Sequence, residues 1–370
     1  MKAMVFHTHG GPEVLAYEEV PTPAPGPEEA LVRVHATTVN RGPDTKVRED
    51  GFGVPGFRLP HVGGADGAGE IVALGPGVTG RRLGERVAIY PLLWCGACDF
   101  CRAGAAENYC RNWRMMGMHR WGAHAEYVAM PVRNLLPLPD GVGHEAAATL
   151  GVSYGTAHHG LARQVRVAPG ETLLVMAGGS GVGAAAVQIG VALGARVLVT
   201  SGAGWKRARA LELGAAAAFD YRDPSWPDQV RAATDGRGVD VVFDNIGAET
   251  WNDSLALLDR AGRMLCSGST GGWEVPLDLR GIYRRMLELR FHMQGGVDDM
   301  RDLIELLDSG AFAPVIDSTL PLSETARAQE RLAAQEQFGK VVLVPDSIGP
   351  ELAATTGARR GGALSSQEER

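Results

Sequence analysis

The sequence contains no apolar run that approaches the roughly 20 residues of a membrane-spanning helix. Its first residues, MKAMVFHTHGG, also lack the apolar segment of a signal peptide. There is no basic surplus either, because the formal net charge is −7 and charges of both signs are interspersed. An acidic chain without basic runs is a poor match for the phosphate backbone of nucleic acids. We therefore expect a cytoplasmic protein with no membrane and no nucleic-acid partner, whose thiols stay reduced.

What the sequence does contain is enough material for two domains with apolar cores: 370 residues, of which 45% are hydrophobic. Fifty glycines and 21 prolines occur without a fixed period, which indicates many tight turns rather than a repeat architecture. Residues 347–370 are polar, small and charged, and we predict that this tail is disordered.

Two patterns follow each other along the chain. Residues 1–130 contain short β-rich runs bounded by glycine or proline. Residues 131–299 alternate β-runs with helical segments of about 10–15 residues, which predicts a parallel, doubly wound sheet. Residues 300–346 then run through helix, strand, helix and strand. The predicted fold class is therefore α/β, with a β-rich domain and a separate parallel-sheet domain.

A glycine turn in the stretch LLVMAGGSGVGAAAVQ joins an apolar strand to a helix of small residues. Its spacing is G-x-G-x-G rather than G-x-G-x-x-G, but a preceding strand, a following helix and a second strand about 20 residues on form the context of a dinucleotide site. We predict that the turn binds a pyrophosphate through Gly179, Ser180, Gly181, Val182 and Gly183. The phosphate charge would meet backbone N–H groups and the helix dipole. The alternative is an ordinary tight turn.

The end of the second strand of this domain bears on the choice of nicotinamide cofactor. NAD sites usually place Asp or Glu there to bind the ribose 2′-hydroxyl. This strand ends instead in Ser201-Gly202-Ala203-Gly204, with Lys206 and Arg207 beyond. With no acid to repel a 2′-phosphate and two cations near it, NADP(H) is favoured over NAD(H). The alternative is that Lys206, Arg207 and Arg209 form the solvated face of a helix.

Residues after later strands complete the predicted cofactor site. Tyr221 and Arg222 follow the third strand and are placed to reach the same phosphate. Asn245 and Ser267 follow the fourth and fifth strands and are assigned to cofactor binding as well.

Four of the five cysteines lie within the stretch CGACDFCRAGAAENYC, residues 95–110. Four thiols packed this closely usually bind a metal, and a reducing compartment disfavours disulfides between them. Cys266 lies alone in an apolar strand, where we expect it to pack as a small hydrophobic side chain.

The whole chain resembles the medium-chain dehydrogenase/reductase superfamily, and most closely its quinone oxidoreductase branch. The likeness covers residues 1–345 and rests on GGPEVLAYEEVPTPAPGPEEALVRVHATTVN, LPHVGGADGAGEIVALGPGV, the GGSGVGAAAVQ turn, LELGAAAAFDYRD and GKVVLV. It implies a GroES-like catalytic domain over residues 1–130, completed by 300–346. It also implies a Rossmann coenzyme domain over 131–299, with the active-site cleft between the two.

The resemblance gives the cysteine cluster a role. Zinc-type members of the superfamily carry C-x2-C-x2-C-x7-C; here Cys95, Cys98 and Cys101 match, while eight residues separate Cys101 from Cys110. Four sulfur ligands suit a closed tetrahedral zinc, which folds its loop and performs no chemistry. We therefore expect one structural zinc, the alternative being a lobe that has lost the metal.

The second, catalytic zinc of the family needs a Cys, a His in a GHE motif, and a further Cys or Asp. This sequence has Arg41 and Ala65 at the first two positions, and the third position falls near Val152. The resemblance thus implies an NADPH-dependent reductase that transfers hydride to a small activated carbonyl compound (a quinone, an enone or other α,β-unsaturated carbonyl, or a ketone) without catalytic zinc. The alternatives are an alcohol dehydrogenase or ketone reductase with a non-standard zinc site, and a non-catalytic NADPH-binding protein.

The resemblance also provides four candidate catalytic residues. Zinc-free relatives place an Asn three residues before the loop Asp, whereas Asn40 lies four before Asp44. Arg41 would place a cation in the vacated metal position, the alternative being a structural ion pair with Asp44 or Asp66. Thr156 resembles a position near the nicotinamide.

The stretch ELRFHMQGG resembles the element through which relatives join their coenzyme domains into one continuous sheet. We therefore predict a homodimer or homotetramer.

Overall fold

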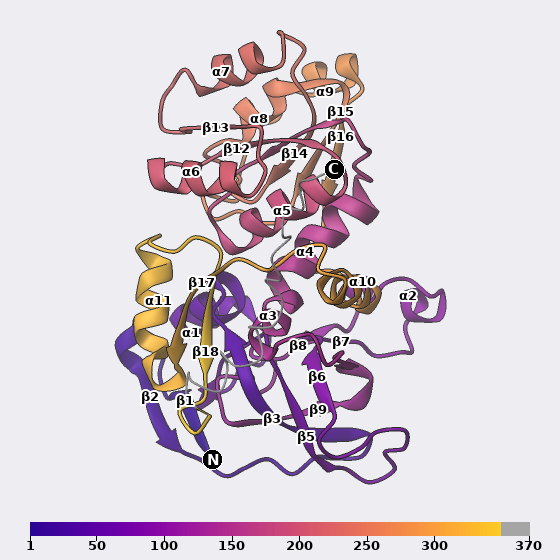
Figure 1. Cartoon of the computed structure of the whole chain (residues 1–370), viewed down its shortest axis with the longest axis vertical. Helices are drawn as coiled ribbons and strands as arrows, with labels where there is room; N and C mark the ends of the chain where they lie inside the picture. Colours follow the sequence, from indigo (N-terminus) through magenta and orange to yellow (C-terminus); the bar gives the residue numbers. More distant parts are fainter. Residues whose placement is uncertain (349–370) are drawn as a thin grey trace, which may run out of the picture.

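The computed structural model describes residues 1–348, which form two domains one above the other (Figure 1). Apart from 347 and 348, the tail predicted to be disordered lies outside the described residues. No helix within residues 1–348 combines the length and the apolar character that crossing a bilayer requires.

The first domain is built from short, mostly antiparallel strands that glycine and proline turns separate. Its strands before the coenzyme domain are β1 (Lys2–Phe6), β2 (Leu15–Glu19), β3 (Glu29–Thr38), β4 (His61–Val62), β5 (Ala68–Leu74), β6 (Arg86–Ile89), β7 (Leu92–Leu93), β8 (Arg114–Met115), β9 (Tyr127–Pro131) and β10 (Leu135–Pro137). β10 pairs with β6 in the main sheet, so this sheet extends past residue 130, where we placed the domain boundary.

The end of the chain returns to the first domain. β17 (Ile316–Pro321) and β18 (Lys340–Val344) extend its main sheet, whose order is β10-β6-β5-β3-β18-β17, with β9 also pairing with β3. β18 pairs with β3 in an antiparallel register, with Val342 opposite Thr38 and Leu343 opposite Thr37. Every residue of β18 is buried, so this late strand forms part of the first domain's core.

The second domain has a six-stranded, fully parallel sheet. Its strands are β11 (Thr172–Val175), β12 (Arg196–Thr200), β13 (Ala217–Phe219), β14 (Val239–Asp244), β15 (Leu258–Cys266) and β16 (Glu288–Phe291). The spatial order β13-β12-β11-β14-β15-β16 is the 3-2-1-4-5-6 order of a Rossmann fold, as predicted. The central strands, TLLV and VDVVFD, are almost wholly buried, as expected for a parallel sheet covered on both faces.

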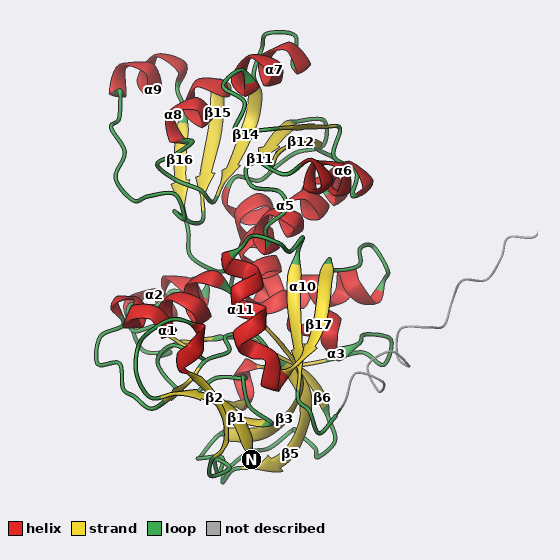
Figure 2. Cartoon of the chain, turned by 90° about the vertical axis from the view of Figure 1, so that its left-hand side faces the viewer, coloured by secondary structure: helices red, strands yellow, loops and turns green. Residues whose placement is uncertain are grey.

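Helices cover the parallel sheet and fill the space between the domains. Those of the coenzyme domain are α5 (Gly181–Ala192), α6 (Gly204–Glu212), α7 (Trp226–Ala233), α8 (Trp251–Leu257) and α9 (Leu279–Arg285). The others are α1 (Val47–Asp50), α2 (Asp99–Arg102), α3 (His144–Ala148), α4 (Gly155–His158), α10 (Val297–Asp308) and α11 (Thr325–Ala333). α5 lies on the side of the coenzyme sheet that faces the first domain (Figure 2).

Candidate functional site

A π-helical turn over Arg41–Lys46 follows β3 and sets the register of the first cleft loop. A π-turn holds one more residue than an α-turn. It accommodates the extra residue between Asn40 and Asp44, so Asn40 is buried while Arg41 is exposed. In the described part of the chain Arg41 has no carboxylate within ion-pair distance, and the pairing with Asp44 or Asp66 that we considered is therefore wrong.

Asn40 is the centre of a buried network in the cleft. Its Nδ2 donates to Asp44 Oδ2 at 3.1 Å and to Asp66 Oδ2 at 2.9 Å. Its Oδ1 accepts from Lys340 Nζ at 2.5 Å, and Lys340 Nζ lies 3.2 Å from Asp66 Oδ2. The side chains of Lys340 and Asp66 are 2% and 0% exposed, so this ion pair is fully buried. Lys340 is a site residue that we did not predict from the sequence; its signal there is a lysine at the start of an otherwise apolar strand.

The remaining oxygens of Asp44 and Asp66 bind backbone N–H groups at or near two positions to which the resemblance assigns ligands of the family's catalytic zinc. Asp44 Oδ1 accepts from the N–H groups of Gly64 and Ala65 at 2.9 and 3.1 Å. Asp66 Oδ1 accepts from the Val152 N–H at 2.7 Å. The side chains at these positions, Ala65 and Val152, have no atom that can bind a metal, and only their backbone N–H groups take part in the network.

Thr156 lies in α4, one helical turn beyond Val152. Its hydroxyl donates to the Val152 carbonyl at 2.6 Å, and its own carbonyl accepts from His292 Nε2 at 2.8 Å. Because the Val152 N–H binds Asp66, the segment that carries Thr156 is fixed to the same network as Asn40.

The glycine turn approaches its neighbours most closely at its two outer glycines. A Cβ on Gly183 would lie 2.2 Å from the Ala177 carbonyl oxygen, and one on Gly178 would lie 2.4 Å from Val199 Cγ1. These glycines are five residues apart, like the outer pair of G-x-G-x-x-G, with Ser180 at the middle position. Ser180 caps α5, because its Oγ accepts from the Gly183 N–H at 3.0 Å. The predicted turn is based on Gly179, Gly181 and Gly183 and does not include Gly178.

The segment with Gly339 and Lys340 brings the glycine turn and the Asn40 network close together. The Gly339 N–H donates to the Gly179 carbonyl at 3.2 Å. A Cβ on Gly181 would lie only 3.0 Å from Lys340 Cδ. Lys340 therefore lies between the predicted pyrophosphate site and Asn40.

Lys206 does not lie on a solvated helix face. It is 8% exposed, its Nζ donates to the Gln335 carbonyl at 2.6 Å, and burial lowers its pKa. Its stem packs against the turn, because a Cβ on Gly179 would lie 2.7 Å from Lys206 Cδ.

The groups near the end of β12 include an acid that the sequence analysis did not consider. Gly202 is flanked by Arg222 and Tyr221, whose Nε and Oη would lie 3.0 and 3.2 Å from an added Cβ. Asp220 pairs with both Arg207, at 2.9 Å, and Arg222, at 3.2 Å. The net positive charge near the end of β12 is therefore smaller than the residues after this strand alone indicate, because Asp220 offsets part of it.

Buried hydroxyls and an amide gather where the strands of the parallel sheet end. Asn245 Nδ2 lies 3.4 Å from Ser180 Oγ. The hydroxyls of Ser267 and Ser269 are buried and have no hydrogen-bond partner within the described residues. Ser201, at the end of β12, is buried as well. Buried polar atoms are rarely left unpaired, so this edge of the sheet, where Rossmann domains bind dinucleotides, fits a polar ligand such as a nicotinamide cofactor.

The four clustered cysteines form a compact sulfur site. Their Sγ atoms are 3.4 Å apart for Cys98 and Cys101, 3.5 Å for Cys95 and Cys110, and 4.0 Å for Cys95 and Cys101. Sulfur atoms bound tetrahedrally to zinc at about 2.3 Å lie about 3.8 Å from one another. All five cysteines are free, and the cluster fits a zinc ion closely.

Hydrogen bonds prepare the cluster for metal binding. Donation from the Ala97 N–H, the Asn112 amide and the Cys98 N–H lowers the pKa of Cys95 to about 6. A thiolate, rather than a thiol, is the form that ligates zinc.

Replacing Cys98 by serine should abolish tight zinc binding and unfold the lobe over residues 95–110, because zinc binding supplies much of the folding free energy of such loops. Metal analysis after dialysis should fall from one zinc per chain to nearly none, and limited proteolysis should cut within the lobe. Cys266→Ser, outside the lobe, is the control. Full zinc content in Cys98→Ser would contradict this assignment.

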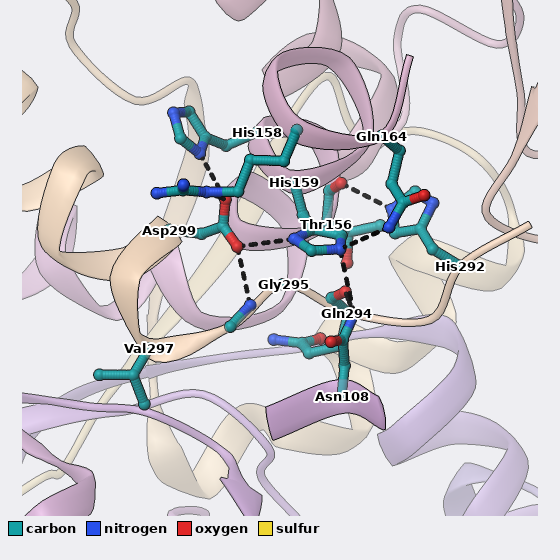
Figure 3. Close-up of polar contacts among 12 residues, drawn as sticks. Asn108, Thr156, His158, His159, Gln164, His292, Gln294, Gly295, Val297 and Asp299 are labelled. Atoms are coloured by element: carbon teal, nitrogen blue, oxygen red, sulfur yellow. Dashed lines mark hydrogen bonds and ion pairs between the residues drawn. The ribbon is translucent and has the colours of Figure 1, made fainter. Parts of the chain in front are cut away.

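A second buried polar cluster lies between the domains around Asp299, near the start of α10 (Figure 3). Its Oδ1 accepts from His158 Nδ1 and Arg163 Nε, and its Oδ2 from His159 Nδ1 and the Gly296 N–H, all at 2.8 Å. Burial alone would raise the pKa of Asp299, but the hydrogen bonds from the two histidines outweigh it and hold this pKa well below its usual range. Both histidines are thus structurally satisfied.

The same cluster fastens the four-cysteine lobe to the rest of the molecule. Asn108, between Cys101 and Cys110, donates to the Gln294 carbonyl at 2.9 Å and lies 3.3 Å from His159 Nε2 (Figure 3). Glu107 Oε2 accepts from the Val297 N–H at 2.8 Å. The lobe therefore braces the start of α10 and the segment that follows β16.

Comparison with protein families gives two matches. Residues 26–140 match the family described as alcohol dehydrogenase GroES-like domain, and residues 181–309 match the family described as zinc-binding dehydrogenase.

Individual proteins match over nearly the whole chain. An NAD-dependent alcohol dehydrogenase of Sulfolobus acidocaldarius is 31% identical over 351 residues, covering 93% of this chain and 99% of the relative. A quinone oxidoreductase of Pseudomonas aeruginosa is 31% identical over 359 residues, with the same coverage. Among solved structures, an NAD-dependent alcohol dehydrogenase superposes with a TM-score of 0.88 at 39% identity, covering 93% of this chain and 99% of that chain.

Proposed function

Because the chain belongs to the medium-chain dehydrogenase/reductase superfamily, we propose that it is an NADPH-dependent reductase of activated carbonyl compounds that works without a catalytic metal. One observation carries this proposal. The positions of the family's catalytic zinc ligands hold side chains without ligand atoms, and the neighbouring carboxylates bind Asn40, Lys340 and backbone N–H groups. Without a Lewis acid, a conjugated and already electrophilic substrate is the easier one to reduce.

The cofactor would bind along the carboxyl edge of the parallel sheet. Its pyrophosphate would face the N-terminus of α5 at the turn from Gly178 to Gly183, where backbone N–H groups and the helix dipole attract negative charge. The hydroxyls of Ser267 and Ser269 would gain the partners they lack. Bound NADPH would supply the hydride.

Of the four candidate catalytic residues, Asn40, Asp44 and Thr156 are buried and Arg41 is exposed. Asn40 and Asp44 are buried and fully hydrogen-bonded, so we assign them the positioning of the cleft loop. Arg41 is exposed and without an ion-pair partner among the described residues, and we assign it, together with Thr156, to the stabilisation of charge on the substrate oxygen. Water would supply the proton that completes the reduction.

The test is NADPH oxidation by the purified protein with a panel of quinones, enones, ketones and simple alcohols, the last with NADP⁺. The proposal expects turnover with members of the first three groups and little with unactivated alcohols. Tight NADPH binding without turnover on any of them would identify a non-catalytic cofactor-binding protein instead.

A specific observation also supports a second candidate, an NAD-dependent alcohol dehydrogenase. Asp220 lies beside Arg207 and Arg222, where an acid is suited to a ribose 2′-hydroxyl, and two of the similar proteins carry that name. A higher kcat/KM with NADH than with NADPH would favour this candidate.

Arg222→Ala separates the two cofactors. A hydrogen bond to a charged group contributes about 1.5–3 kcal/mol, so KM for NADPH should rise about tenfold or more, while KM for NADH stays unchanged. Arg209→Ala, on α6 and packed over Phe338, is the matched control. Equal effects on both cofactors would show that Arg222 does not recognise the phosphate.

We also propose that the chain forms a homodimer or a larger homo-oligomer through β16. This strand lies at the edge of the parallel sheet, and large apolar side chains on and beside it are exposed: Met286, Phe291 and Met293. An unpaired, apolar sheet edge is suited to pairing with another copy. Light scattering should give at least a dimer, and a monomer would contradict this.

A further inference from the structure

Three side chains of the first domain, outside the cleft and the four-cysteine lobe, converge from different elements. His35 is on β3, Glu70 on β5, and His144 is the first residue of α3. The β3–β5 pairing shifts register at His35, since Val34 pairs with Gly69 and Ala36 with Ala68. His35 is therefore the extra residue of a β-bulge, a feature that redirects a side chain.

The three side chains have the spacing of metal ligands. His35 Nε2 lies 3.6 Å from Glu70 Oε2, and the two imidazole rings are 4.3 Å apart between centroids. One ligand atom from each residue lies within 4.8 Å of the others. Small side-chain adjustments would bring all three to the roughly 2.0–2.2 Å that zinc requires.

Two nitrogen atoms in this group make no hydrogen bond within the described residues. Nε2 of His35 and Nε2 of His144 are both buried without a hydrogen bond within the described residues. Buried polar atoms are rarely left unpaired, and two such atoms beside a carboxylate form a set of electron-pair donors. We propose that His35, Glu70 and His144 bind a divalent transition-metal ion, of which zinc is the most available that accepts two imidazoles and a carboxylate.

The alternative is a direct hydrogen bond between His35 and Glu70. The 3.6 Å between His35 Nε2 and Glu70 Oε2 is too long for such a bond. An ion held by the neutral imidazoles, the form of histidine that binds metal, would account for this spacing.

Neighbouring charges set the strength of this site. Arg33 Nη2 donates to Glu70 Oε2 at 2.9 Å, which orients the carboxylate. The same oxygen lies 3.6 Å from His35 Nε2, so Arg33 and the ion would share it. The same guanidinium disfavours a nearby cation, so we expect weaker binding than in the four-cysteine lobe. The ion would fasten the start of α3 to β3 and β5, independently of the proposed reductase activity.

Calorimetric titration of the dialysed full chain with ZnCl₂ tests the site. The wild type should take up one zinc equivalent that His144→Ala and Glu70→Gln bind about 10- to 100-fold more weakly. His7→Ala, which removes an exposed histidine paired with Glu18, is the control and should titrate like the wild type. Zinc should raise the unfolding temperature of the wild type and His7→Ala, but not that of the two site variants.

Two results would overturn the metal site. One is the absence of zinc uptake by the dialysed wild type. The other is equal uptake by wild type and Glu70→Gln, a nearly isosteric change that decides the question even if His144→Ala fails to fold.

Discussion

Lys340→Met should lower the free energy of unfolding by about 3–5 kcal/mol and strongly reduce cofactor binding. Removing one partner of a buried ion pair leaves an uncompensated charge in the interior. Here two buried carboxylates, Asp44 and Asp66, share the amide of Asn40, and Lys340 is the ammonium that balances them. Urea denaturation measures the stability, and NADPH titration measures the effect at the glycine turn.

A double-mutant cycle isolates the ion pair from the loss of packing. Lys340→Met combined with Asp66→Asn should be less destabilised than the sum of the two single changes, by about 1–3 kcal/mol. Lys46→Met, which removes a half-exposed lysine paired with Glu49, should change stability by about 0.5 kcal/mol at most. Additive effects in the cycle would mean that Lys340 and Asp66 do not stabilise each other.

Asp299→Asn should lower the free energy of unfolding by about 2–4 kcal/mol near neutral pH. The carboxylate is 1% exposed and accepts hydrogen bonds from His158, His159, Arg163 and a backbone N–H. An amide of the same shape keeps one acceptor oxygen, but it loses the charge and the second acceptor. Asp298→Asn, at an exposed neighbour paired with Arg301, is the control.

The same substitution should change how stability depends on pH. The pKa of Asp299 is lower in the folded chain than its ordinary value of 3.8, so the unfolded chain binds this proton more readily. The contribution of Asp299 is therefore complete above its unfolded pKa and is lost as pH falls from about 5 towards the lower folded value. Urea midpoints between about pH 5 and about pH 2 should fall less steeply in Asp299→Asn than in the wild type. Parallel curves would contradict the assigned shift.

The features that could be predicted from the sequence depend on residues that lie close together along the chain. The alternation of strand and helix after residue 131 predicts a parallel sheet because each element carries its own periodicity. The cysteines lie within 16 positions of one another, so their spacing alone indicates a metal site. The glycine turn was recognised for the same reason.

The features that the sequence did not reveal depend on contacts between distant segments. Asn40 and Lys340 are 300 residues apart, and only the return of β18 to β3 brings them together. The buried position of Asn40 depends on the π-helical turn over Arg41–Lys46. The number of residues between Asn40 and Asp44 does not by itself predict such a turn. Asp220 follows the third strand, β13, and only the folding of the chain places it beside Arg207 near the end of β12.

The return of β18 has a consequence for how the chain folds during synthesis. All six strands of the coenzyme sheet, residues 172–291, are synthesised before β17 and β18. The first domain, although it begins the chain, must wait for its last strand, and its two buried carboxylates wait for their lysine. The middle of the polypeptide is therefore the part able to mature first, which inverts the usual N-to-C order of domain folding during translation.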